Sequence, residues 1–143
     1  MRPRTGREYG LLCRAAAAIA VGRIGLLVFP LAKVRRAVQS LCRSGRPLPL
    51  ERRATPEQVI RAAVSAGLHS PVGSTCLATA LVAQAMLQHH GYEARLCLGV
   101  RRNAGGAFAA HAWLEREGKV VVGGPLSEIE SYTPLPEMEH LIR

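Results

Sequence analysis

A change of hydrophobic periodicity at Gly91 limits the fold of this chain more than any other feature. Before it, STCLATALVAQAMLQHHG (residues 74–91) begins with Ser and Thr, which cap helices, and continues with Leu, Ala and Met up to a terminating glycine. After it, residues 92–100 alternate between apolar and polar, which is typical of a half-buried strand. Residues 108–115 and 119–122 are predicted to form two further strands, joined by a turn at Glu117 and Gly118.

Three earlier segments are predicted to be helical. Residues 8–29 form one helix that Pro30 ends, and residues 31–43 form a basic amphipathic one. After a linker rich in Pro and Arg (residues 43–53), Thr55 caps a third helix, with Pro56 at its first position and Gln58 completing a capping box. We therefore expect an α+β fold, with a basic helical segment and linker (1–50) preceding the main domain (51–143) and a short extra strand around Tyr132.

The charge of the chain is concentrated at one end. The net charge is +9, and residues 1–53 alone carry twelve Lys or Arg and two Glu. This asymmetry indicates an acidic partner, a membrane surface or nucleic acid. Two aromatic residues, Tyr9 and Phe29, are too few for a nucleic-acid stacking platform, so we expect no nucleic acid. The charge-free runs 15–22 and 24–32 are shorter than the about 20 residues that span a bilayer, and peripheral membrane contact ranks below a protein partner.

The cysteines predict thiol chemistry more readily than metal or disulfide chemistry. Cys13, Cys42, Cys76 and Cys97 are widely spaced and form no C-x-x-C motif, so we expect reduced thiols in a cytoplasmic protein, with no metal and no cofactor. Cys76 falls in the first turn of its predicted helix, where the helix dipole and free N–H groups lower a thiol pKa. The same N–H groups can serve as an oxyanion hole.

His111, on the second predicted strand, is the candidate partner of Cys76, because a nearby imidazole forms a thiolate–imidazolium pair and later protonates the leaving group. The alternative is that Cys76 is a small buried hydrophobe and His111 an ordinary polar contact. Cys42 and Cys97 are interpreted as packing residues. Trp113, on the His111 face, is either core or a lid over the reactive face. His89 and His90, in a last helical turn, are interpreted as cations near the negative helix end.

Several stretches together resemble one family. These are ATPEQVIRAAV (54–64), the stretch 75–102 with its Cys-Leu helix, a Gly and a strand ending in Gly-Val, and the hairpin FAAHAWLEREGKVVVGG (108–124). They resemble the lasso-peptide leader peptidases, in the short form that lacks a leader-recognition domain, within the transglutaminase-like, papain-related cysteine proteases. The resemblance covers about residues 54–134.

This resemblance implies a hydrolase, a cysteine protease that removes the leader from a ribosomally made precursor peptide. Cys76 matches the family nucleophile and His111 its base. The implied partners are the leader region of the precursor, a separate leader-recognition protein, and an ATP-dependent cyclase that closes the lasso ring.

The acid that orients the histidine in this family is missing here. It lies on the strand after the histidine strand, where this chain has Val122-Gly123-Gly124, and the chain contains no Asp. If the turn at Glu117 and Gly118 sets the pairing, His111 lies across from Gly124 and Trp113 across from Val122.

Glu128 is the predicted third catalytic residue, because it follows Pro125 and can fold back. Glu130 is a second choice. Glu115 lies about 13 Å from His111 along the same strand, and Glu117 and Glu93 lie farther from His111. Asn103 is a loop residue and a less favoured candidate. A backbone carbonyl or a water is the remaining alternative.

Two other functions stay open. One is an acyl transferase or amidase on the same fold, and the other is a non-catalytic scaffold that docks peptide and cyclase through its basic helices.

Overall fold

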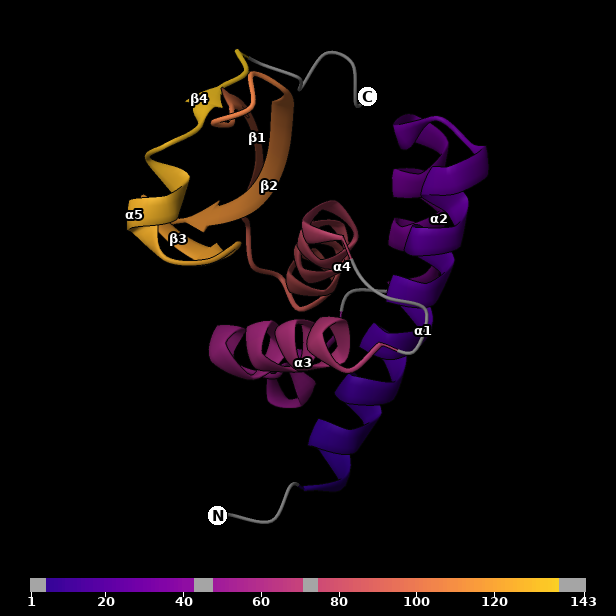
Figure 1. Ribbon diagram of the computed structural model, residues 1–143. Helices are drawn as coiled ribbons and strands as arrows, with labels where there is room; N and C mark the ends of the chain where they lie inside the picture. Colours follow the sequence, from indigo (N-terminus) through magenta and orange to yellow (C-terminus); the bar gives the residue numbers. More distant parts are fainter. Residues whose placement is uncertain (1–4, 43–47, 71–74, 137–143) are drawn as a thin grey trace.

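The computed structural model describes residues 5–42, 48–70 and 75–136 (Figure 1). Its elements are, in order, α1 (Gly6–Val28), α2 (Leu31–Cys42), a 3-10 turn (Leu50–Arg52), α3 (Pro56–Leu68), α4 (Cys76–His89), β1 (Arg95–Arg102), β2 (Phe108–Arg116), β3 (Lys119–Val122), α5 (Leu126–Ile129) and β4 (Thr133–Pro134). The predicted α+β class is confirmed. The short helix α5 was not predicted, and the extra strand predicted around Tyr132 is β4.

Side-chain caps explain where three of the helices begin. Thr5 and Glu8 form a capping box at α1, and Thr55 and Gln58 form the predicted one at α3. Thr75 caps α4 by accepting the Ala78 N–H at 3.2 Å. Each cap provides a partner for a helical N–H that would otherwise have none.

Helix α4 lies at the centre of the molecule. In Figure 1 the α1–α2 pair lies on one side of α4, α3 lies beneath it, and the sheet lies on the other side. Residues all around α4 are buried: Ala78, Ala80, Leu81, Val82, Ala83, Gln84, Ala85, Met86, Leu87 and His89. A helix that is apolar on all sides must be enclosed, and here α1, α2, α3 and the sheet enclose it.

The N-terminal helices belong to the same core as α3 and α4. The buried residues of α1 and α2 form one cluster with those of α3, α4, β2 and β3. Small residues allow the close crossing: a Cβ at Gly22 would lie 3.5 Å from Val38, and one at Gly25 would lie 3.1 Å from Val34. Helix α1 is long and apolar enough, by length and composition, to cross a membrane. One face of it joins the core in this fold, whereas Ile24, Leu27 and Val28 near its end are exposed.

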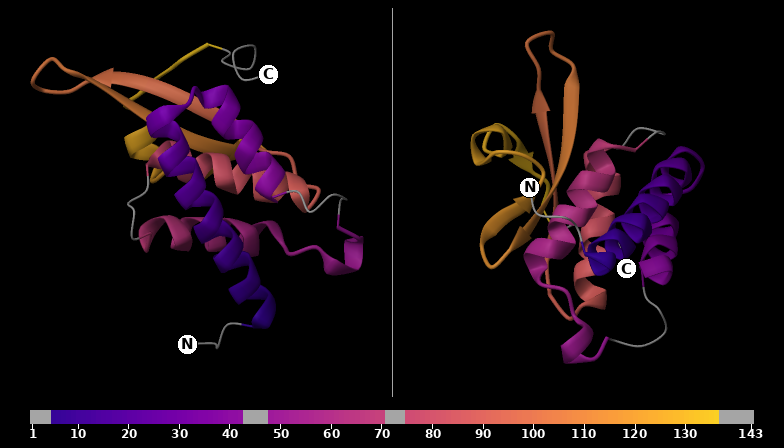
Figure 2. Two further views of the ribbon diagram at one scale, coloured as in Figure 1. Left: turned by 90° about the vertical axis from the view of Figure 1, so that its right-hand side faces the viewer. Right: turned by 90° about the horizontal axis from the view of Figure 1, so that it is seen from below.

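The sheet is antiparallel, with the strand order β3-β2-β1-β4. The β1–β2 hairpin extends beyond the helices (Figure 2). The predicted pairing of β2 with β3 holds at Arg116–Lys119 and Glu115–Val120, but an irregularity follows and Leu114 pairs with Val122. Our prediction that Trp113 lies across from Val122 was therefore wrong by one residue, because a β-bulge shifts the register.

A second, smaller core covers the face of the sheet opposite α4. Trp113, Ile129 and Tyr132 form it, and Trp113 is 2% exposed, so Trp113 is a core residue. Gly99 makes this packing fit: a Cβ there would lie 2.8 Å from the Trp113 ring and 2.9 Å from Tyr132 Cβ. Glycine at this strand position thus marks a close approach of two large side chains.

His89 and His90 are not surface cations, which corrects our interpretation of the end of α4. Both are buried. Burial lowers the pKa of His89, and burial with the nearby charges of His89, Arg14, Arg7 and Arg53 lowers the pKa of His90 to about 4. His90 Nδ1 accepts the Ala54 N–H at 3.0 Å, a bond that needs the neutral ring.

The free energy of unfolding should therefore depend on pH through His90. The native pKa is depressed, so between about pH 6.5 and about pH 4 the unfolded chain binds a proton that the native protein does not. Stability is complete above this window and falls as the pH drops through it. His90→Asn keeps an acceptor for Ala54 and should flatten the dependence in urea titrations at several pH values. The control His69→Asn, at an exposed histidine, should keep the wild-type slope; an equal slope in His90→Asn would refute the assignment.

Gly99→Ala should destabilise the protein by about 1–3 kcal/mol, the usual cost of overpacking. The added methyl meets Trp113 and Tyr132, neither of which can move without disturbing the smaller core. Urea unfolding measures the effect. Gly105→Ala is the matched control, because its Cβ would meet only Asn103 Oδ1 at 3.6 Å. If Gly99→Ala lowered the free energy of unfolding no more than Gly105→Ala does, Trp113 and Tyr132 would be shown to accommodate the methyl group at little cost.

Candidate active site

Cys76 is the first residue of α4, half-buried and with a free thiol. The Thr75 cap uses the Ala78 N–H. Helix geometry leaves the N–H groups of Cys76 and Leu77 without partners inside the helix. A thiolate at this position faces the positive end of the helix dipole. The local structure therefore provides both a site for a reactive sulfur and donors beside it.

The other cysteines occupy different environments. Cys42 is fully buried, and burial raises its pKa to about 11, against a smaller opposing effect of Arg14. Cys97 on β1 is half-buried, and burial is the largest cause of its raised pKa. Cys13 is exposed and lies in the interior of α1, not at its start. Among the four cysteines, Cys76 is the one that lies at the start of a helix.

His111 lies on β2 just beyond the point where β3 stops pairing. It is across from Gly99 of β1, whereas the β3 ladder ends at the Leu114–Val122 pair. Its Nε2 lies 2.6 Å from the carbonyl oxygen of Gly123. A carbonyl only accepts, so Nε2 must donate, and in the neutral ring Nδ1 is the basic nitrogen.

Cys76 and His111 line the same cavity, of about 170 Å³. The rest of its wall comes from the end of α3, the first turn of α4 and the end of β3: Val64, Gly67, Leu68, Thr79, Val122 and Gly123. Most of these side chains are apolar. The structure thus brings together two of the three predicted catalytic residues, from elements far apart in the sequence.

The two glycines after β3 leave little room for an acidic side chain at either position. Gly123 has φ +124°, and a Cβ there would lie 2.5 Å from Trp113 Cβ. Gly124 has φ +104°, and its Cβ would lie 3.2 Å from a carboxylate oxygen of Glu128. Both conformations disfavour an L side chain. A side chain at Gly123 would collide with the core, and an acid at Gly124 would stand against a like charge.

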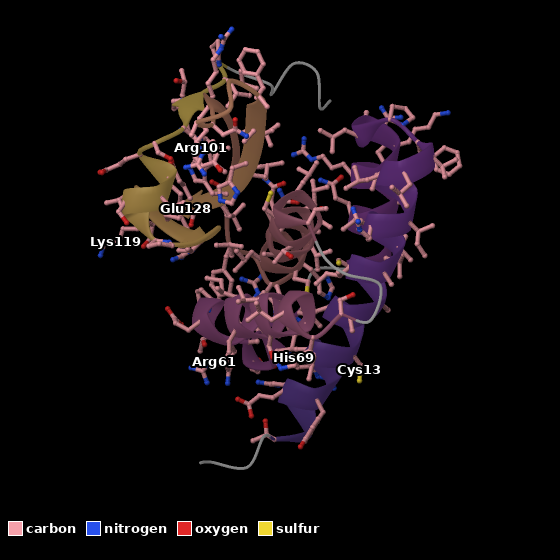
Figure 3. All side chains as sticks on the ribbon, viewed as in Figure 1. Cys13, Arg61, His69, Arg101, Lys119 and Glu128 are labelled. Atoms are coloured by element: carbon pink, nitrogen blue, oxygen red, sulfur yellow. The ribbon has the colours of Figure 1, made fainter. Side chains whose placement is uncertain are left out.

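Glu128, the predicted third residue, lies on α5 with its carboxylate beside Gly124. Figure 3 shows it on the same side of the sheet as Arg101. Within the described part of the chain, the hydrogen-bond partner of the His111 ring is the Gly123 carbonyl. Glu128 is therefore near the site, and its orienting role stays a prediction.

Three of the other polar candidates have partners elsewhere. Glu115 accepts from the Trp113 indole at 3.0 Å and pairs with Arg95 at 3.4 Å. Glu117 pairs with Arg116 at 3.1 Å. The Asn103 side chain accepts from the Gly105 and Ala107 N–H groups in the β1–β2 loop. None of these contacts involves His111.

Sequence reasoning missed one close neighbour of His111. The ring of Tyr132 stacks on it, with centroids 5.1 Å apart and planes at 29°. The Trp113 ring, which was expected on this face, lies 6.3 Å away at 24°. Tyr132 follows α5, an element without a sequence signal, so its approach to the site could not be predicted. The sequence allowed a backbone carbonyl as the partner of His111 but did not identify it as that of Gly123.

Comparison with known proteins gives one match. The model of the transglutaminase-like superfamily matches residues 14–137. No curated protein and no solved structure matches. The matched region runs from α1 past β4 and includes both Cys76 and His111. With this match over most of its length, and a cysteine at a helix start sharing a cavity with a strand histidine, the chain belongs to the transglutaminase-like superfamily.

Proposed function

We propose that this protein is a cysteine endopeptidase that removes the leader from a ribosomally made lasso-peptide precursor. The observation that carries the proposal is the cavity shared by Cys76 and His111, with His111 Nε2 engaged by a carbonyl so that Nδ1 is left as the base. The substrate class rests on the motif resemblance of residues 54–134. The superfamily fold supports cysteine chemistry of this kind.

In the proposed mechanism, His111 Nδ1 takes the Cys76 thiol proton and the thiolate attacks the scissile carbonyl. The N–H groups of the first turn of α4 stabilise the resulting oxyanion. The His111 imidazolium then protonates the leaving amine, which departs as the core peptide. Water, deprotonated by His111, cleaves the thioester and releases the leader with a free carboxylate and the thiol regenerated.

We also propose that the enzyme acts in the cytoplasm, with a separate leader-recognition protein and an ATP-dependent cyclase. Seven charged residues lie between Glu8 and Glu51, and all are basic. Of these, Lys33 and Arg36 are exposed on α2. Such a surface is complementary to an acidic partner.

Cys76→Ala and His111→Ala should each abolish cleavage of a cognate precursor in the presence of its recognition protein, because each removes one half of the nucleophile–base pair. Mass spectrometry of the peptide products measures this. Cys97→Ala is the control, since it removes a half-buried thiol on β1 that is absent from the cavity wall, and it should cleave normally. Full cleavage by Cys76→Ala would refute the proposal.

The alternative reaction on the same site is acyl transfer. With an added primary amine, a hydrolase should release the leader as the free acid, whereas a transferase should release it as the amide. The two products differ in mass. Predominant amide formation would replace the peptidase assignment by the transferase.

Rapid alkylation of Cys76 by iodoacetamide separates an enzyme from a scaffold. At neutral pH a thiolate paired with His111 should react at least about tenfold faster than Cys97, whose raised pKa keeps it protonated. Digestion with trypsin places Cys76 and Cys97 on different peptides, so mass spectrometry reports each rate. Equal rates would favour the non-catalytic scaffold.

A further inference from the structure

The unusual feature of this site is that a neutral group orients the histidine. In a catalytic triad the carboxylate holds the ring and stabilises the imidazolium. Here the hydrogen bond from Nε2 goes to the Gly123 carbonyl. One such bond fixes the tautomer but leaves the ring free to rotate about the axis of the bond. A second contact on the face of the ring would remove that freedom.

Tyr132 makes such a contact. Its ring stacks on His111 at 5.1 Å, and the residue is only 8% exposed. Its N–H donates to the Ile129 carbonyl at 3.0 Å, at the end of α5. Tyr132 is therefore placed to confine the His111 ring.

Tyr132 is in turn held from β1. The Arg101 guanidinium lies over its ring, 4.5 Å from the centroid. The same guanidinium donates to Ser131 Oγ at 2.8 Å, and Ser131 Oγ donates to the Glu128 carbonyl at 2.6 Å. These contacts tie the sheet to the end of α5. Gly99, across from His111, leaves space for the Tyr132 side chain to approach.

We propose that Tyr132 is a positioning residue for His111, and that Arg101 supports it by holding its ring. Together with the Gly123 carbonyl, Tyr132 takes over the orienting role that an acid has in a triad. This inference rests on the proposed pairing of Cys76 with His111. It predicts that an aromatic ring at position 132, rather than the hydroxyl group, matters for Cys76 reactivity.

The test is the pH profile of Cys76 alkylation by iodoacetamide in the full chain. The peptide spanning residues 62–95, which trypsin releases, contains Cys76 as its one cysteine, so the rate is specific to this site. In the wild type, a thiolate–imidazolium pair should keep Cys76 reactive well below the ordinary thiol pKa of about 8.5. We call this reactivity at low pH the acid limb of the profile. Tyr132→Phe should keep the acid limb.

Tyr132→Leu should lose the acid limb of the Cys76 alkylation profile. The rate at pH 6 should fall about tenfold, whereas the rate at pH 9, where a thiol ionises without help, should change less than about twofold. A merely structural defect would alter both rates. Arg101→Leu should also lower the alkylation rate at pH 6, by a smaller factor. Because Arg101 is only half-buried, this variant tests the idea even if Tyr132→Leu folds poorly, which circular dichroism would show.

Phe108→Leu is the matched control. It removes an aromatic ring from a similar stack, in which Arg102 lies 4.8 Å over Phe108, but at an exposed site away from the cavity. It should leave the wild-type profile unchanged.

Two failures are distinguishable. A wild type without an acid limb would refute the Cys76–His111 pair itself. A wild-type limb that persists in both Tyr132→Leu and Arg101→Leu would refute only the positioning role, and so would equal losses in Tyr132→Phe and Tyr132→Leu.

Discussion

The burial of α4 on all sides is the constraint on which the rest of the structure depends. A helix of Ala, Leu, Val and Met has no polar side to expose, so α1, α2 and α3 pack around it on one side and the sheet on the other. Burial of this kind fixes the direction of a helix axis closely. The Thr75 cap then determines where the helix starts, and hence where the Cys76 sulfur lies relative to β2.

Much of this arrangement could be predicted from local signals. The Thr55 capping box, the helix start at Cys76 and the strand at residues 119–122 depend on neighbouring residues, and each appears where its pattern placed it. The pairing of β2 with β3 was correct next to the turn and wrong beyond it. A bulge depends on how a whole strand packs on the core, and side-chain alternation does not report it.

The parts of the site that depend on the identity of a side chain could be predicted from the sequence. Cysteine at a helix start and histidine on a strand are visible in the sequence, and the fold brings them to one cavity. The group that engages His111 is a main-chain carbonyl, which every residue has, so composition cannot reveal it. His89 and His90 show the same limit, because their neutral state follows from tertiary burial and not from their place at a helix end.

The segment that carries Tyr132 is held much less firmly than the helical core. Helix α5 has four residues, and β4 contributes the pairs Gly99–Pro134 and Val100–Thr133 together with the bond from the Leu135 N–H to the Leu98 carbonyl. Elements with so few contacts open locally at a lower free energy than the whole molecule. Residues 126–135 should therefore exchange their amide hydrogens before α4 does. If Tyr132 holds the His111 ring, mild heating would disorder the base while the central helix stays folded, and loss of function would precede the melting transition.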